Sequence, residues 1–272
     1  MALSRPSLGK WRLWSALLSV FFQDGVAYRA QGVIWILTDV TVLLVMPLVW
    51  ISASKGGPIN GFSTADFVNY YLCVVLITQF VQSHFMWDVA FEIREGVFSA
   101  QIVRPVNWLE FMLVRNLAWR CIRLVLFLPW FLVFAFAYRG YLGAGEFHLT
   151  WQFFLSVVLG HSVSVMTVLA MSLIALFVQE AQTIFEIYYL PMLFLSGQMF
   201  PVALYPAWAQ KLSSWLPFYY TVGAPTDILV GRTHGAHLTG VLLAQVAWVL
   251  AMAVAFRLMW RFGLRHYTGV GM

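Results

Sequence analysis

Few side chains in this sequence could bind a nucleotide or catalyse a reaction, and their spacing suits neither task. A phosphate-binding loop of the form Gly-x4-Gly-Lys-Ser/Thr does not occur, since the one Gly-Lys pair, Gly9-Lys10, is followed by Trp11. The histidines form no His-Glu-x-x-His pattern, and Cys73 and Cys121 are too few for a cysteine-rich metal site. The sequence therefore predicts no catalytic residue, no metal site and no cofactor bound by this chain.

An intramembrane serine hydrolase is the enzymatic alternative, because it needs only a buried serine and a histidine on a neighbouring helix. His161 lies beside Ser162 and Ser164, on the same segment rather than on a neighbour. Ser156, Gly160 and Ser164 are instead four residues apart, which is typical of a small-residue face for close helix packing. We expect packing at these positions.

One acidic residue, Asp39, interrupts an otherwise apolar stretch. A charge at membrane depth is costly and usually functional. Asp39 could line a polar path or form a hydrogen bond to a neighbouring helix, and its sequence context leaves both roles open.

The composition identifies the elements that must position these residues. The chain has 272 residues, of which 61% are hydrophobic and only 10% charged, and its mean hydropathy is +0.80. Soluble domains average about 25% charged residues, so an ordinary water-soluble enzyme is excluded. The net charge of +5 is explained by membrane topology, and nucleic acid is not expected as a partner.

A helix that crosses the hydrocarbon core needs roughly 20 mostly apolar residues. The sequence contains six such stretches, which predict an all-α, polytopic fold of one transmembrane domain over residues 1–272: 33–52, 67–87, 117–137, 152–178, 184–200 and 239–260. With the N-terminus inside, 12 of the 16 Lys and Arg residues fall on the cytoplasmic side. This bias predicts that both termini are cytoplasmic.

Two further segments are expected at the membrane surfaces. Residues 8–29 carry apolar side chains at helical spacing among charged ones, which is typical of an amphipathic helix in the inner interface. Residues 201–220 contain too many prolines to span the membrane and too many aromatic residues for a solvated loop. They predict an outer re-entrant hairpin between the fifth and sixth spans.

The loop over residues 88–105 is the main cytoplasmic feature. Acids at its start and Arg104 near its end suit the two ends of a short helix, which Pro105 would terminate. Phe98 and Ile102 are four residues apart and share one face. This face could present an apolar knob to a soluble partner, although a solvated helical loop would have the same spacing.

Taken together, these motifs resemble the membrane subunit of an ATP-binding-cassette exporter of the ABC-2 type, in its bacterial branch. The resemblance covers nearly the whole chain and is carried by these pieces: Tyr28-Arg29, Glu92-Ile-Arg94-Glu95-Gly96, Arg104-Pro105, Ser196-Gly197, Phe200-Pro201, Pro206-Ala-Trp208, Leu216-Pro217 and Leu229-Val-Gly231. The outer loop from Ser52 to Asp66 is short, so no large extracellular domain is expected.

The resemblance implies a multi-pass protein of the bacterial inner (plasma) membrane. It would pair with a second copy or a sister permease, among membrane lipids, and two cytoplasmic ATPase subunits would use ATP and Mg. The coupling segment would comprise Glu92, Arg94, Glu95, Gly96, Phe98, Ile102, Arg104 and Pro105. The translocation path or gate would include Asp39, Phe200, Pro201, Pro206 and Pro217.

The substrate is expected to be amphiphilic, lipid-like or a glycan. A six-span secondary carrier or intramembrane enzyme that acts alone is the alternative function.

Overall fold

The computed structural model describes residues 9–27, 29–142 and 147–267, apart from the side chains of residues 29–31, 35, 36, 39, 40 and 43. Regular structure in these ranges is entirely helical. In chain order the elements are α1 (Lys10–Ala27), α2 (Arg29–Ala53), η1 (Ser54–Gly56), α3 (Thr64–Val81), α4 (Met86–Arg94), α5 (Val97–Ile102), α6 (Trp108–Ala137), α7 (Trp151–Ser172), η2 (Leu173–Leu176), α8 (Ala181–Leu195), η3 (Val202–Leu204), α9 (Ala207–Trp215), α10 (Gly223–Leu229) and α11 (Gly235–His266).

Polar side chains fix where several long helices begin. The Ser63 side chain accepts a hydrogen bond from the Asp66 amide, and the Asp66 carboxylate accepts one from the Ser63 amide, which forms a capping box before α3. The Asn107 side chain accepts a hydrogen bond from the amide of Leu109 and so caps the start of α6. Hydropathy alone predicts a start near residue 117 for this span, because it does not reveal the cap.

Four stretches of the described chain are long and apolar enough to cross a membrane: Thr64–Arg94, Trp108–Ala137, Trp151–Leu176 and Gly235–His266. They coincide with the second, third, fourth and sixth expected spans. The first expected span falls on α2, which has 25 residues and contains Pro47.

The fifth expected span, 184–200, is helical only as far as Leu195. It falls on α8, which has 15 residues, contains Pro191 and ends at Leu195 before a turn. At about 1.5 Å per residue, α8 is roughly 22 Å long. This is shorter than the hydrocarbon core, which is about 30 Å thick.

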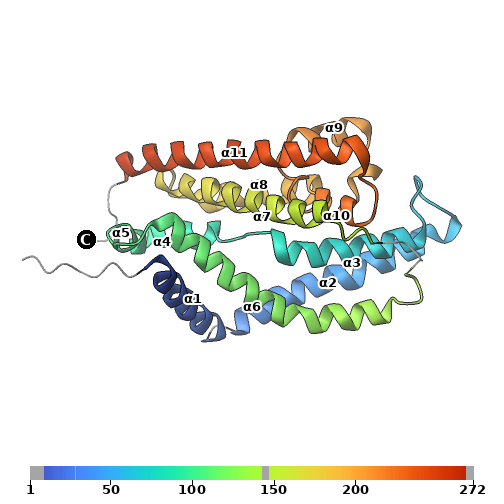
Figure 1. Cartoon of the computed structure of the whole chain (residues 1–272), viewed down its shortest axis with the longest axis horizontal. Coiled ribbons are helices and arrows are strands. Elements are labelled where there is room, and N and C mark those ends of the chain that lie inside the picture. Colours follow the sequence, from blue (N-terminus) through green and yellow to red (C-terminus); the bar gives the residue numbers. More distant parts are fainter. Residues whose placement is uncertain (1–8, 28, 143–146, 268–272) are drawn as a thin grey trace, which may run out of the picture.

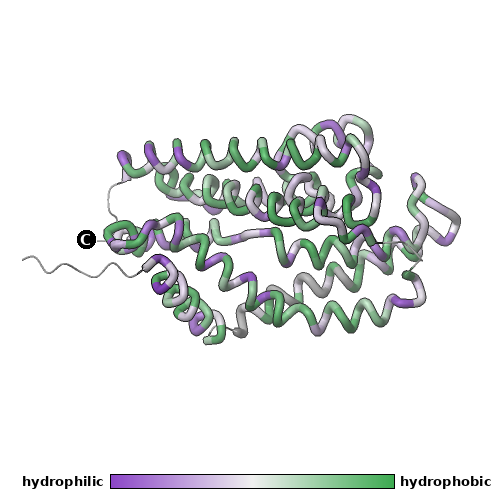
Figure 2. Tube along the Cα trace, in the orientation of Figure 1, coloured by the Kyte–Doolittle hydropathy of each residue, from purple (hydrophilic) through white to green (hydrophobic). Residues whose placement is uncertain are grey.

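The long helices lie side by side in an elongated bundle (Figure 1). Helix α7 packs along α11 and also contacts α3 and α10, while α2 lies against α3 and α6. Helices α4 and α5 lie at one end, together with the start of α1 and the end of α11, and α9 and α10 lie at the other. Figure 2 shows apolar residues along the middle of α11 and hydrophilic ones where α11 ends near α5.

The small-residue face of α7 packs closely, as expected. Ser156 is fully buried and Ser164 nearly so. A Cβ at Gly160 would collide with the backbone carbonyl of Thr221. This face therefore packs against the segment before α10. Gln245 of α11 connects α7 to that segment, because its side-chain amide donates to the carbonyls of Ser156 at 3.0 Å and Tyr220 at 2.9 Å.

We predict that Gly160→Ala lowers the midpoint of thermal unfolding in detergent, because its Cβ has no space beside the Thr221 carbonyl. Gly240→Ala is the matched control. It also lies within a helix, its Cβ meets nothing within 4 Å, and alanine favours helix by about 1 kcal/mol over glycine. Equal midpoints for the two variants would contradict the close approach.

Candidate functional site

The second membrane stretch is not one continuous helix. Helix α3 ends at Val81, residues 82–84 have no helical assignment, and α4 begins at Met86. Gln82 and Ser83 in this link are buried. Non-helical backbone at membrane depth must find its hydrogen-bond partners within the protein or a water-filled cavity.

Arg120 of α6 supplies most of these partners. Its guanidinium donates to the backbone carbonyls of Gln79 at 2.8 Å and Gln82 at 2.9 Å, and more weakly to that of Val81 at 3.4 Å. It also donates to the Ser83 hydroxyl at 3.1 Å. Arg120 is only 9% exposed, so one buried cation holds the end of α3 and the link that follows.

Helix α7 binds the other side of this link. The backbone amide of Ser83 donates to the Ser164 hydroxyl at 3.0 Å, and Nδ1 of His161 lies 3.1 Å from the Val81 carbonyl. The hydroxyl of Ser162 donates to the Val158 carbonyl at 2.8 Å. His161, Ser162 and Ser164, the residues of the hydrolase alternative, thus all have backbone partners.

A cavity of about 430 Å³ lies beside the link, between α3, α4, α6 and α8. Polar and aromatic groups share its wall: the arginines Arg115, Arg120 and Arg123, the acids Asp88 and Glu186, and the rings of His84, Trp87, Trp119 and Tyr189. The Trp87 indole donates to Glu186 at 3.1 Å. Such a mixture suits a ligand that has both a charged and an apolar part.

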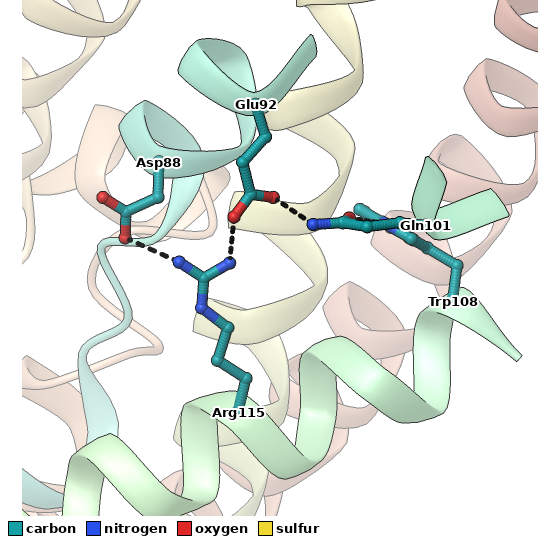
Figure 3. A network of polar contacts seen from close by, with 5 residues as sticks. All are labelled: Asp88, Glu92, Gln101, Trp108 and Arg115. Atoms are coloured by element: carbon teal, nitrogen blue, oxygen red, sulfur yellow. Dashed lines mark hydrogen bonds and ion pairs between the residues drawn. The ribbon is translucent and has the colours of Figure 1, made fainter. Parts of the chain in front are cut away.

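A polar network joins the cavity wall to the helices at the end of the molecule (Figure 3). Nη1 of Arg115 lies 2.6 Å from Oε1 of Glu92, and Nη2 lies 3.7 Å from Asp88. The other Glu92 oxygen accepts from Gln101 at 3.0 Å, and Gln101 accepts from the Trp108 indole at 3.1 Å. Helices α4, α5 and α6 are therefore tied together by one chain of contacts.

A family model described as "ABC-2 family transporter protein" matches residues 36–271, which is most of the chain. The chain belongs to the ABC-2 family of transporter proteins. This places it among membrane transport subunits, in agreement with its apolar helices. No curated protein matches the chain significantly.

In this ABC-2 family protein, the expected coupling segment 88–105 forms two short helices, α4 and α5. Gly96 separates them with a φ of 75°, in the left-handed region that favours glycine. Arg94 and Glu95 form an exposed ion pair at 3.3 Å. Arg104 and Pro105 follow α5 and are exposed.

Phe98 and Ile102 do not present an apolar knob at the surface of this chain. Phe98 is fully buried and lies edge-on to the rings of Trp108, Trp260 and Tyr267. Ile102 is partly buried in the same cluster. The spacing correctly placed both residues on one face, but that face packs inside the protein.

The large apolar residues exposed on α4 and around α5 are others: Phe91, Val97 and Val103, which are 50%, 45% and 80% exposed. We call these three residues the α4–α5 apolar surface.

Four of the expected path or gate residues lie in the segments on either side of α9, a helix at the opposite end of the molecule from α4 and α5 (Figure 1): Phe200, Pro201, Pro206 and Pro217. The ring of Phe200 contacts that of Trp50 edge-on and that of Phe194 at a tilt. Pro201 and Pro206 precede η3 and α9, respectively, and Pro217 is buried after α9. The structure does not bring Pro206 and Pro217 to the cavity, whose lining belongs to other residues.

The acid named for the translocation path, Asp39, lies in α2, but its side chain is outside the described residues. A different acid is notable at the end that holds α9 and α10. Asp227 of α10 accepts a hydrogen bond from Tyr219 at 2.8 Å, and burial raises its pKa to about 6.

The residues that hold the broken helix were not among those expected to form a site. Arg115, Arg120 and Arg123 all lie within α6 and line the cavity. A signal was available, because Asn116 and Arg120 are four residues apart and share a helix face. Asn116 indeed donates to the Ser83 hydroxyl at 2.9 Å.

We predict that the Arg115–Glu92 pair stabilises the fold and that the Arg94–Glu95 pair does not. Double-mutant cycles with glutamine at both positions, measured by unfolding in detergent, should give a coupling of about 1–3 kcal/mol for the first pair. This pair is largely shielded, with side chains 18% and 15% exposed. The exposed second pair should give less than about 0.5 kcal/mol, and equal couplings would contradict the network.

We also predict that Phe98→Ala destabilises the protein by about 3–5 kcal/mol, the usual cost of emptying an aromatic core site. Phe91→Ala, whose side chain is half exposed, should cost less than about 1 kcal/mol. Unfolding by heat or denaturant in the same detergent measures both. A Phe98→Ala variant as stable as Phe91→Ala would contradict the burial of the Phe98 side chain.

Proposed function

We propose that this chain is the permease subunit of an ATP-driven exporter, and that a separate cytoplasmic ATPase drives it. Membership of the ABC-2 family supports this proposal. So does the sequence, in which no phosphate-binding loop occurs. ATP and Mg would be bound and used by the partner.

The observation that carries the proposal is the attachment of α4 and α5. Their apolar surface is exposed, while the Arg115–Glu92 pair and the buried Phe98 hold them to α6 and α11. A partner that moves this surface would move long helices rather than a loose loop. A packed element of this kind can transmit a displacement to a distant site.

The proposed topology has six crossings with both termini in the cytoplasm. It is supported by the charge bias and by the position of the described chain ends beside α4 and α5 (Figure 1). Helix α1 would lie in the inner interface. The prolines before η3 and α9 would shape the outer re-entrant hairpin, and the short α8 would lead into it.

A second copy or a sister permease would complete the path for an amphiphilic, lipid-like or glycan substrate. Helices α6 and α11 leave large apolar side chains exposed in this chain, among them Val125, Leu132, Leu250 and Val254. Such surfaces suit contact with lipid or with a second permease. We infer outward transport from the family resemblance.

Affinity purification of the tagged chain from its native membranes tests the proposal. We expect an ATPase subunit with a phosphate-binding loop to co-purify. Val103→Asp should reduce its recovery at least about fivefold, because a charge would enter an apolar contact. Val103 is 80% exposed, so the variant should fold normally.

Ala207→Asp is the matched control. It adds the same charge to an exposed position at the first turn of α9, at the other end of the molecule, where an acid is favourable. Equal recovery of the ATPase subunit with both variants would indicate that the ATPase docks on another surface. Uphill transport or substrate cleavage by the purified chain alone, in liposomes, would contradict the proposed function and favour the stand-alone carrier or intramembrane enzyme.

A further inference from the structure

The last turns of α11 have an inward and an outward side. Phe256, Trp260 and Leu264 pack against the buried apolar cluster at this end of the molecule. Gly263 lies on the same side, because a Cβ there would collide with the side chain of Leu176. The opposite side of these turns is exposed.

Three arginines form a row on the exposed side of α11. Arg257, Arg261 and Arg265 are each four residues apart, which places them on neighbouring turns, and all three are exposed. The ion pairs of the described residues involve none of them, and the sequence of α11 contains no Asp or Glu. Because like charges at this spacing repel one another, the row favours an anion supplied from outside.

Apolar side chains lie between and above these arginines. Leu258 and Phe262 are 48% and 49% exposed, and Leu250 and Val254 on the preceding turns are 62% and 58% exposed. The exposed side of α11 thus passes from apolar to cationic without a break, as Figure 2 shows for the helix as a whole. A phospholipid has the matching sequence of groups, because its apolar chains end in a phosphate.

The length of α11 places this row at the depth of lipid headgroups. Its 32 residues extend over roughly 48 Å at about 1.5 Å per residue. The hydrocarbon core is about 30 Å thick, so the two ends of a spanning α11 must leave it. An arginine near such an end keeps its aliphatic stem among the acyl chains and directs its guanidinium to the headgroups.

We propose that the exposed side of the last turns of α11 binds the phosphate of anionic phospholipids, with Arg257 and Arg261 as the main contacts. Guanidinium groups bind phosphate oxygens through paired hydrogen bonds. Leu258 and Phe262 would contact the first carbons of the acyl chains. The inference rests on the proposed topology only in assigning these lipids to the inner leaflet.

Native mass spectrometry of the purified chain in a neutral detergent tests the site without any ATPase. The probes are phosphatidylglycerol and phosphatidylcholine with the same acyl chains, each titrated to give a dissociation constant. We expect phosphatidylglycerol to bind at least about fivefold more tightly, because its headgroup carries a net negative charge and the row has no acid to offset it.

Variants that remove or keep the charge test the contact itself. Arg261→Gln should weaken binding of phosphatidylglycerol about fivefold, the factor that corresponds to one arginine near an anionic lipid surface. Arg257→Gln combined with Arg261→Gln should weaken it at least about tenfold. Arg261→Lys should keep most of the affinity because it keeps the charge, and affinity for phosphatidylcholine should change less than about twofold in every variant.

Arg139→Gln is the matched control. Arg139 is exposed just after α6, whose last turn lies at the end of the bundle away from α5 (Figure 1). Its guanidinium stacks on the ring of Phe136, with Cζ 4.1 Å from the ring centroid. It belongs to no row of arginines, so this variant should change affinity for phosphatidylglycerol less than about twofold.

Equal affinity for the two phospholipids, or equal effects of Arg261→Gln and Arg139→Gln, would overturn the proposal. Variants that bind phosphatidylglycerol normally but no longer retain a co-purifying ATPase would assign the row to a protein contact and also overturn it. Lipid binding is measured on the chain alone and is independent of whether an ATPase co-purifies. The failure of this site and the failure of the proposed function are therefore distinguishable.

Discussion

The structure depends on one buried guanidinium that replaces the helical hydrogen bonds lost where α3 ends. At the end of α3 and in the following link, backbone carbonyl groups have no helical partner. Arg120 donates hydrogen bonds to those of Gln79 and Gln82. Without it, buried backbone groups would stay unpaired, at a cost of several kcal/mol each in lipid. This contact joins α6 to the broken helix at the wall of the cavity.

The same helix, α6, serves two regions because its arginines are five residues apart. Arg120 faces the link, and Arg115 faces α4, where it pairs with Glu92. The wall of the cavity and the attachment of α4 are thus parts of one rigid helix. If a partner displaced α4 and α5, as we propose, the movement would reach the cavity through an ion pair and packed rings rather than through flexible loops.

For α4 and α5, the sequence predicts the position of the segment but not the direction of its apolar face. Residue types and the family resemblance located the segment, and the spacing of Phe98 and Ile102 correctly placed them on one face. The direction of that face could not be predicted, because it depends on Trp260 and Tyr267, which lie far along the chain. The acceptors of Arg120 could not be predicted from local pattern either, because they are carbonyls at and just after the end of α3, about 40 residues earlier in the chain.

The sequence by itself determined the all-helical class, four stretches long and apolar enough to cross a membrane, and the transporter family. Each of these follows from hydropathy and motifs that are local in the chain. Tertiary structure alone decided where α3 breaks, which side of α5 is exposed and which charges share a cavity. Those outcomes depend on contacts between residues about 40 to 170 positions apart, because a buried polar group is stable only where a distant segment supplies its partner.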